Sequence, residues 1–289
     1  MKNLLFPVLI LVSALSVSAQ TKTKGILLEN LTWIEAEKVL TDKTIVVIPL
    51  GAAAKEHGPH LKLKNDWLIA EYLKDRVLER SNVVVAPVVT YHFYPAFLEY
   101  PGSTSLRLET ARDLLIDICK SFARYGPRRF YVLNTGVSTV RALQPAAETL
   151  ARDGITLRYT DLLKITGPVE KSIGKQPGGT HADEIETSMM LYMAPATVNM
   201  RKAAKDYHPS NERGLTRDPN GKGIYSATGI YGDATLATRA KGEKITKALI
   251  AGVLKEIEDL RQTPELERAS EPDSPKVLKN ENVTGNKRF

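Results

Sequence analysis

Cysteine is almost absent from this sequence, since Cys119 is the only one among 289 residues. A single thiol excludes an intrachain disulfide. Cys119 ends the segment 114–119, whose apolar residues follow a helical pattern. We therefore expect a buried structural thiol there and not a nucleophile.

Long runs of like charge are also missing. The chain has 40 Lys and Arg against 33 Asp and Glu, a formal net charge of +7, and the two signs are interleaved, as in residues 71–76. A scattered excess of this kind is typical of a solvated surface. We therefore expect no nucleic-acid partner.

The N-terminal apolar segment is short for a membrane span. Lys2 precedes the apolar residues 4–17, and the small residues Ser18 and Ala19 follow them. This pattern predicts a secretory signal peptide over residues 1–19, cleaved before Gln20. We therefore expect an exported protein, periplasmic or secreted, with no membrane contact after cleavage.

Apolar patterning predicts one α/β domain over residues 25–260. Buried strands are expected at 44–50, 82–91, 129–134 and 155–160, and helices at 31–40, 66–80, 106–125 and 139–152. This alternation predicts a single-domain layered fold with a mostly parallel sheet covered by helices on both faces. Ligand sites in such folds lie at the carboxyl ends of the strands, here after Leu50, Tyr91 and Asn134. Residues 261–289 are polar and proline-containing, and they predict a tail.

The densest polar cluster follows the first of these strands. It contains Lys55, Glu56, His57 and His60, and Asp66 lies a little downstream. Histidine and carboxylate side chains together suit zinc or manganese. Asp66 opens the next predicted helix, so helix capping alone would also explain it.

A second cluster surrounds His181. Thr180 and Asp183 form a capping-box pattern that predicts the start of a helix. On the wheel of that helix Glu186 falls beside the apolar stripe, whereas Glu184 points away. A carboxylate that faces the core must be paired or bind a metal, so the alternative for Glu186 is a buried ion pair with Lys or Arg. The positive helix end favours neutral His181, which suits metal binding or proton transfer.

Four segments resemble the creatininase (creatinine amidohydrolase) family. They are EHGPHL at 56–61, YPGSTSL at 100–106, HADEIETS at 181–188 and TGIYGD at 228–233. Their order and spacing hold from about residue 30 to 255.

The resemblance implies a two-metal centre that activates water for attack on an amide or related bond. It also implies a role for each matching residue. His57 would be a metal ligand, Asp66 would bridge the two metals, His181 would transfer a proton and Glu186 would be an acid of the site. Members of the family are typically oligomeric, so we expect a homo-oligomer.

Two positions depart from the family pattern. Lys55 stands where the family has a glutamate, with Glu56 next to it, and Gly136 stands where the family has a histidine ligand. Both changes remove ligands from the same metal site, so we expect fewer ions than two. His57 and Asp66 should hold a divalent metal, zinc or else manganese, with Glu186 or His181 completing the site and Glu56 as a further candidate ligand. Lys55 could stabilise a developing oxyanion.

These observations favour an exported, metal-dependent hydrolase. Its substrate would be a small amide, lactam or related polar compound, cleaved through metal-activated water. We expect His60 and Tyr94 to contact the substrate. The alternative is a catalytically degenerate binding protein that keeps the fold and has lost part of the metal site.

Overall fold

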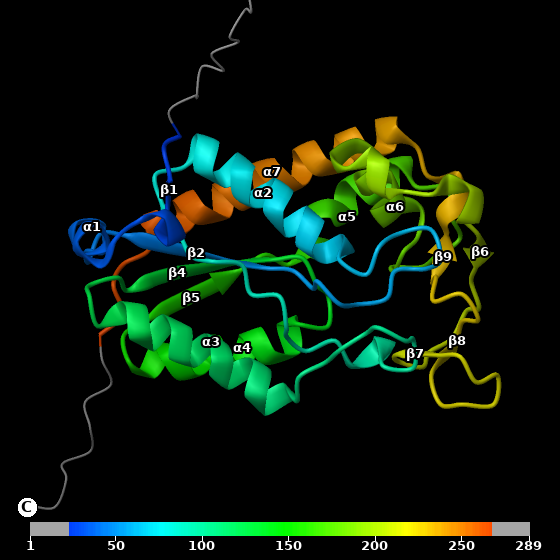
Figure 1. The fold of residues 1–289 in the computed structure, drawn as a ribbon, viewed down its shortest axis with the longest axis horizontal. Coiled ribbons are helices and arrows are strands. Elements are labelled where there is room, and N and C mark those ends of the chain that lie inside the picture. The colour runs from blue at the N-terminus through cyan, green and yellow to red at the C-terminus, as the bar shows by residue number, and fades with distance from the viewer. Residues whose placement is uncertain (1–22, 268–289) are drawn as a thin grey trace, which may run out of the picture.

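Five parallel strands form the central sheet of the computed structural model, which describes residues 23–267 (Figure 1). Their spatial order is β1-β3-β2-β4-β5. Their bounds are β1 Ile26–Leu27, β2 Ile45–Leu50, β3 Val84–Val85, β4 Arg129–Asn134 and β5 Thr156–Tyr159. The longest pairing joins β2 to β4, from Ile45 opposite Arg129 to Leu50 opposite Asn134.

Helices cover both faces of this sheet. Figure 1 shows α2, α5, α6 and α7 on one side and α3 and α4 on the other. The helices are α1 Trp33–Val39, α2 Asn65–Arg80, α3 Leu108–Ala123, α4 Val140–Arg152, α5 Leu162–Ile173, α6 Glu184–Met193 and α7 Arg239–Arg261. The predicted α/β fold with a mostly parallel, doubly covered sheet is therefore confirmed.

Short strands and 3₁₀ helices outside the central sheet lie within the loops that surround the site. Two-residue strands pair as β6 Lys205–Asp206 with β9 Gly232–Asp233, and as β7 Leu215–Thr216 with β8 Ile224–Tyr225. Five 3₁₀ helices are described, namely η1 Leu28–Asn30, η2 Pro95–Phe97, η3 Pro195–Thr197, η4 Met200–Lys202 and η5 Ala234–Leu236.

The sheet separates two hydrophobic cores. Because successive side chains of a strand point to opposite faces, Val47 and Tyr131 join the core beneath α2 and α7, whereas Val46 and Phe130 join the core beneath α3 and α4. All six residues of β2 are buried. Burial on both faces is what makes these strands continuous apolar runs in the sequence.

The strand expected at 82–91 is much shorter in the structure. Only Val84 and Val85 form a regular strand, and Val89 rejoins the sheet through an isolated bridge to Leu50. Pro87 lies between them, and a proline has no N–H group to donate to the ladder. The prediction of a continuous strand there is therefore wrong.

The sequence predicts a signal peptide at one chain end and a polar tail at the other. The predicted signal peptide at 1–19 lies outside the described residues, as do residues 268–289 of the predicted tail. The first part of that tail lies against the sheet, because the Arg129 guanidinium donates to the carbonyl of Thr263 at 3.2 and 3.3 Å. None of the helices within residues 23–267 has the length and apolarity that a membrane crossing requires.

Candidate metal centre and substrate cavity

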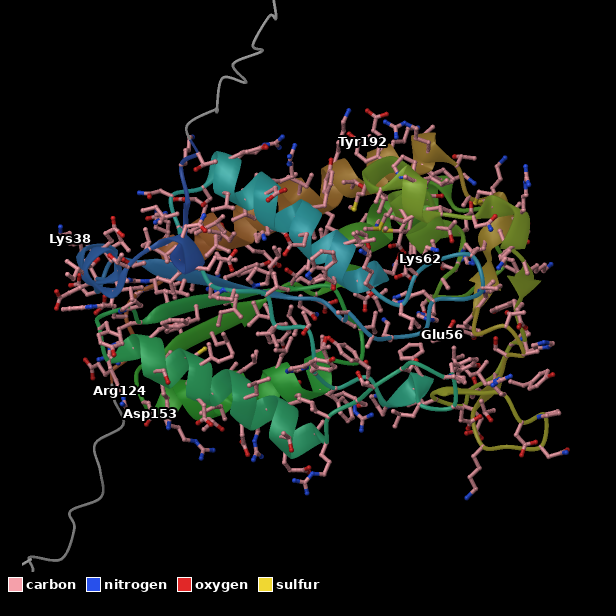
Figure 2. The ribbon with its side chains drawn as sticks, viewed as in Figure 1. Lys38, Glu56, Lys62, Arg124, Asp153 and Tyr192 are labelled. Carbon is pink, nitrogen blue, oxygen red and sulfur yellow. The ribbon has the colours of Figure 1, made fainter. Side chains whose placement is uncertain are left out.

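The loop between β2 and α2 holds the first polar cluster, at the carboxyl end of β2 where ligand sites of parallel sheets lie (Figure 2). The loop starts at Gly51, against which the first turn of α2 packs. A Cβ atom there would lie only 2.4 Å from the Asp66 carbonyl oxygen. A glycine is therefore needed at this point to bring Asp66 next to the loop.

His57 is the most enclosed member of the loop. Its Nδ1 lies 2.9 Å from the Lys55 carbonyl oxygen, which can only accept, so Nδ1 carries a hydrogen. Its Nε2 faces Asp66 Oδ1 at 2.7 Å and Glu186 Oε1 at 3.3 Å. The carbonyl thus orients the ring so that Nε2 is the atom offered to an ion.

The pKa of His57 reflects these neighbours. Burial lowers the pKa, but the carboxylates of Asp66 and Glu186 outweigh it and raise the pKa to about 9. Without a metal the ring is therefore protonated at neutral pH, and a bound ion would have to displace that proton.

Lys55 lies on the other side of Asp66. Its Nζ is 2.7 Å from Asp66 Oδ2, and both side chains are buried. Burial raises the pKa of Asp66, but the Lys55 and His57 charges outweigh it and lower the pKa. One carboxylate is thus shared between an ammonium group and an imidazole.

Helix α6 supplies the side of the site that faces the β2–α2 loop. It begins at Glu184, and its N-cap is Asp183, whose carboxylate accepts from the backbone N–H groups of Ile185 and Glu186. The predicted cap at Thr180 is therefore wrong, because Asp183 itself satisfies the first-turn donors.

Glu186 enters the site from the first turn of α6. Its Oε1 accepts from the Asn65 side chain at 2.9 Å, and its Oε2 accepts from the Ala182 backbone at 2.7 Å. Burial raises its pKa, but His57 and His181 outweigh it and hold the pKa well below the usual range. The buried carboxylate predicted at this position is therefore ionised and faces His57.

The sequence predicted that Glu184 would point away from the apolar stripe of the helix, but the structure shows it buried. Its side chain is fully buried and forms an ion pair with Lys241 of α7. The backbone N–H groups of Lys175 and Gln176 also donate to it, at 2.8 and 2.6 Å. The prediction failed because α6 packs against α7 on the face that carries Glu184.

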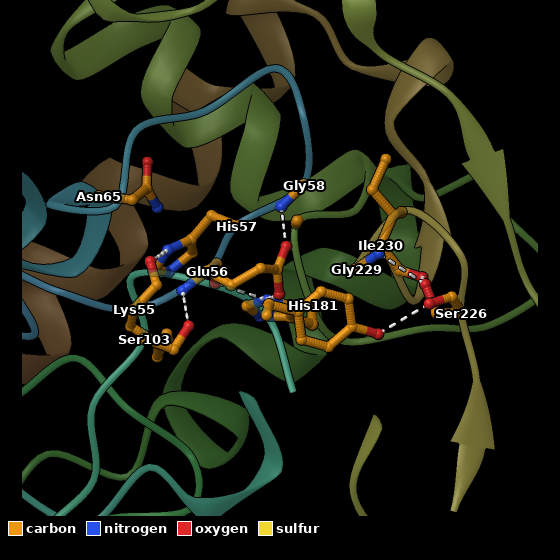
Figure 3. Close-up of polar contacts among 12 residues, drawn as sticks. Lys55, Glu56, His57, Gly58, Asn65, Ser103, His181, Ser226, Gly229 and Ile230 are labelled. Carbon is orange, nitrogen blue, oxygen red and sulfur yellow. Dashed lines mark hydrogen bonds and ion pairs between the residues drawn. The ribbon is translucent and has the colours of Figure 1, made fainter. Parts of the chain in front are cut away.

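His181 completes a three-residue cluster with His57 and Glu186, and Figure 3 shows His181 beside Glu56. Its Nε2 lies 3.0 Å from the Glu56 carbonyl oxygen and 3.1 Å from Glu56 Oε2, so Nε2 carries a hydrogen. Its Nδ1 is left facing Glu186 Oε2 at 3.8 Å. His57, His181 and Glu186 each offer an atom within 4.8 Å of the other two. The geometry therefore makes His181 a candidate ligand, whereas the family resemblance implies proton transfer.

Glu56 and Asp66 lie outside this three-residue set. The Glu56 carboxylate accepts from the Gly58 backbone and from His181, so it orients a candidate ligand (Figure 3). Gly229, at φ +82°, packs directly on that carboxylate and leaves no room for a Cβ atom. Asp66 remains 2.7 Å from His57 but is held by Lys55.

His60 and Tyr94, predicted to contact the substrate, are not among the residues that line the cavity. His60 Nε2 bonds to Thr187 Oγ1 at 2.8 Å, and burial lowers the His60 pKa to about 4. Tyr94 is 1% exposed, and its hydroxyl has no partner among residues 23–267. Both rings are buried behind the site and not in its open face.

Gly136 is enclosed by the same packing. A Cβ atom there would lie 2.9 Å from Thr139 Cγ2 and 3.6 Å from the Tyr94 ring. The place where the family pattern has a histidine is therefore already filled by neighbouring side chains.

A cavity of about 620 Å³ opens beside the cluster and is lined in part by Lys55, His181 and Glu186. Phe97 of η2 also lines the cavity and contacts two of these residues, since its ring centroid is 4.3 Å from that of His181 and 4.7 Å from Lys55 Nζ. Sequence reasoning missed Phe97 and Asn65, because an aromatic and an amide side chain carry no metal-site signal of their own.

The donor set suits one divalent ion. Two imidazole nitrogens and a carboxylate converge, with a second carboxylate at contact distance, and this combination suits zinc or manganese. The second nitrogen of each imidazole is bound to a backbone carbonyl, as in established metal sites. A second ion on the far side of Asp66 would meet the Lys55 ammonium group.

Comparisons with known proteins agree with the sequence resemblance. Residues 29–257 match the creatininase family, described as creatinine amidohydrolase. Creatinine amidohydrolase of Pseudomonas putida is 27% identical over 250 residues, which cover 80% of this chain and 95% of that protein. A mycofactocin precursor peptide peptidase of Mycobacterium tuberculosis is 29% identical over 222 residues, which cover 71% of this chain and 81% of that protein.

Solved structures show the same fold. A crystal structure of creatininase superposes with a TM-score of 0.69 at 24% identity and covers 83% of this chain and 99% of that one. A structure described as "Creatininase Mn" gives the same TM-score and identity. At this identity the superposition establishes the fold alone. The match over residues 29–257 places the chain in the creatininase family of hydrolases.

Proposed function

We propose that this chain is a hydrolase that holds one divalent ion, zinc or manganese, and cleaves an amide-type bond. The observation that carries the proposal is the shared Asp66 carboxylate, with Lys55 Nζ at 2.7 Å from one oxygen and His57 Nε2 at 2.7 Å from the other. The imidazole side would hold the ion, whereas the ammonium side already holds a positive charge. Residues 1–19 support the further proposal that the enzyme acts after export.

The charges of the cluster favour one ion over two. The carboxylates of Asp66, Glu186 and Glu56 are balanced by Lys55 and one divalent cation, since −3 + 1 + 2 is zero. A second divalent ion would leave two excess positive charges in a buried site, which is unfavourable at low dielectric. A single ion with His57, His181 and Glu186 as ligands matches this balance.

A bound ion would polarise a carbonyl group and lower the pKa of water. The residues of the chain supply the remaining functions. Lys55 lines the cavity and can donate a hydrogen bond to the oxygen that becomes negative during attack. Glu56 fixes the ring of His181, and Asn65 fixes the carboxylate of Glu186.

The relatives do not fix the substrate. Their names describe a creatinine amidohydrolase, a peptide peptidase and, in Thermotoga maritima, a 3-dehydro-scyllo-inosose hydrolase. We therefore propose only the bond class, a carbonyl-centred C–N or related bond of a small molecule.

Metal analysis of the purified chain, with hydrolysis assays on amides, lactams and short peptides, tests the proposal. We expect about one equivalent of tightly bound ion and turnover that disappears with a chelator. Two tight equivalents would refute the single-ion site. One equivalent without turnover on the substrates would favour a binding protein that keeps the fold.

Single-residue variants test the ligand set. His57→Ala and His181→Ala should each weaken metal binding by on the order of tenfold or more. If His181→Ala instead kept its metal and lost about 10²–10⁴ in rate, His181 would be a proton-transfer residue.

A further inference from the structure

The cavity beside the metal centre is much larger than a small cyclic amide requires. Its volume of about 620 Å³ lies in the middle of the range, about 300–1,000 Å³, found for pockets that bury drug-sized ligands. A five-membered lactam at the metal centre would leave most of this space to water. The volume therefore indicates a substrate with a sizeable group beyond the bond that is cleaved.

The interior of the cavity is apolar. Ile185 and Met189 of α6 line it beside Glu186, and Ile69 of α2 and Phe97 of η2 add further apolar surface. These four side chains are each less than 10% exposed. Ile69, Ile185 and Met189 are packed in the core beneath α2 and α7, and Phe97 is packed against Tyr94 in a separate small cluster. Their positions are therefore set by packing and not by a ligand, so the apolar wall is preformed.

The outer part of the cavity is also apolar on two sides. Val137, in the loop before α4, and Leu163, at the start of α5, line it and are 48% and 46% exposed. Large apolar side chains left half open at the edge of a preformed apolar cavity would be covered by an apolar ligand.

The charged residues of the lining do not select for one sign. Arg141 and Arg213 are exposed in the lining, and Glu170 and Glu212 line it as well. The Asp183 carboxylate also lines the cavity, but it is engaged in capping α6, and the remaining two cations and two anions cancel. Recognition beyond the metal centre therefore depends on apolar bulk and not on substrate charge.

We propose that the substrate is an amide that bears a large apolar substituent, of the size of a hydrophobic amino-acid side chain or more, which lies between α5, α6 and Phe97. This inference rests on the proposed function for the bond that is cleaved, and it adds what the enzyme selects. Fully burying a leucine-sized group is favourable enough for a preference of tenfold or more in kcat/KM.

A matched pair of probes tests the substituent. N-acetylglycinamide and N-acetylleucinamide differ only in the side chain. With the zinc- or manganese-loaded chain, kcat/KM should be at least about tenfold higher for N-acetylleucinamide. Equal values for the two probes would overturn the inference while leaving the hydrolase function standing.

A binding measurement separates the two proposals if neither probe is cleaved. Calorimetry on the metal-loaded chain should then still show N-acetylleucinamide binding on the order of tenfold more tightly than N-acetylglycinamide. That result would sustain the apolar selectivity and refute hydrolysis of these amides. Equally weak binding of both would overturn the selectivity as well.

Leu163→Trp places a larger ring in the outer cavity, at a side chain exposed enough to accept it. The preference for N-acetylleucinamide should fall by on the order of tenfold. Leu98→Trp is the matched control, because Leu98 is 57% exposed and does not line the cavity, so it should keep the preference. An unchanged preference in Leu163→Trp would show that the apolar group does not lie between α5 and α6.

Discussion

Replacing Lys55 with glutamine tests whether its charge limits the site to one ion. The amide of Lys55→Gln can still donate to Asp66, so the change removes the positive charge and keeps a hydrogen bond. Metal binding on the His57 side should become tighter, because a cation 2.7 Å from the shared carboxylate is removed. Turnover should fall, because the donor to the developing oxyanion is no longer charged.

The size of the effect follows from Coulomb's law. Across the carboxylate, the Lys55 ammonium group and an ion bound by His57 would be separated by roughly 7 Å. The repulsion between the single charge of Lys55 and the double charge of the ion is 332·2/(ε·r), which at ε of about 20 and about 7 Å is near 5 kcal/mol before solvent and salt screening reduce it. We therefore expect metal affinity to rise by on the order of tenfold to a hundredfold and kcat to fall by about 10²–10³.

Competition with a chromophoric chelator measures the affinity, and metal analysis counts the equivalents. Lys62→Gln is the matched control, since Lys62 lies on the same loop and is exposed (Figure 2). It should change neither quantity. Weaker metal binding in Lys55→Gln would show that Lys55 supports the ion, and the single-ion argument would then fail.

Three further predictions concern stability. Glu184→Ala should lower the free energy of unfolding by about 3–5 kcal/mol in urea denaturation, because it leaves Lys241 as an uncompensated charge. Glu243→Ala, which removes one partner of an exposed ion pair, is the matched control and should leave the free energy of unfolding nearly unchanged. Burial lowers the His92 pKa to about 4, so between pH 6.5 and 4 only the unfolded chain takes up this proton. Stability should therefore fall by about 2 kcal/mol from pH 7 to 5, and His92→Phe should lack this part of the decline in urea titrations at both pH values. Gly136→His should lower the free energy of unfolding by roughly 1–3 kcal/mol, because neighbouring side chains fill the space. A near-zero effect of Glu184→Ala on the free energy of unfolding would contradict the buried ion pair. A pH dependence of stability in His92→Phe equal to that of the unchanged chain would contradict the role of His92. A melting temperature that does not fall in Gly136→His would contradict the close packing at Gly136.

The sheet was predictable where strands are buried on both faces. β2 and β4 are continuous apolar runs, and both were located from sequence to within a residue. Helix α5 had no such signal, because Gly167 and Pro168 in its interior are residues that argue against a helix. Its packing against α7 stabilises it instead, and that contact is not visible in the local sequence.

The site was predictable in part for a related reason. The loop cluster around His57 stood out because its residues are adjacent in sequence, and Glu186 stood out because a carboxylate lies beside an apolar stripe. The burial of Glu184 could not be seen, because its partner Lys241 lies 57 residues away. The choice between ligand and proton-transfer residue for His181 likewise depended on Glu56, 125 residues away.

The distance along the chain between the two halves of the metal cluster affects folding as well as chemistry. His57 comes from the β2–α2 loop and Glu186 from α6, and the contact between Asn65 and Glu186 spans 121 residues. An ion held by both halves would act as a reversible cross-link in a chain whose single cysteine rules out a disulfide. It would stabilise the folded state by about 2.7 kcal/mol when the free ion is present at 100 times its dissociation constant. The metal content of the surroundings would then set the stability of the folded domain, even in the absence of substrate.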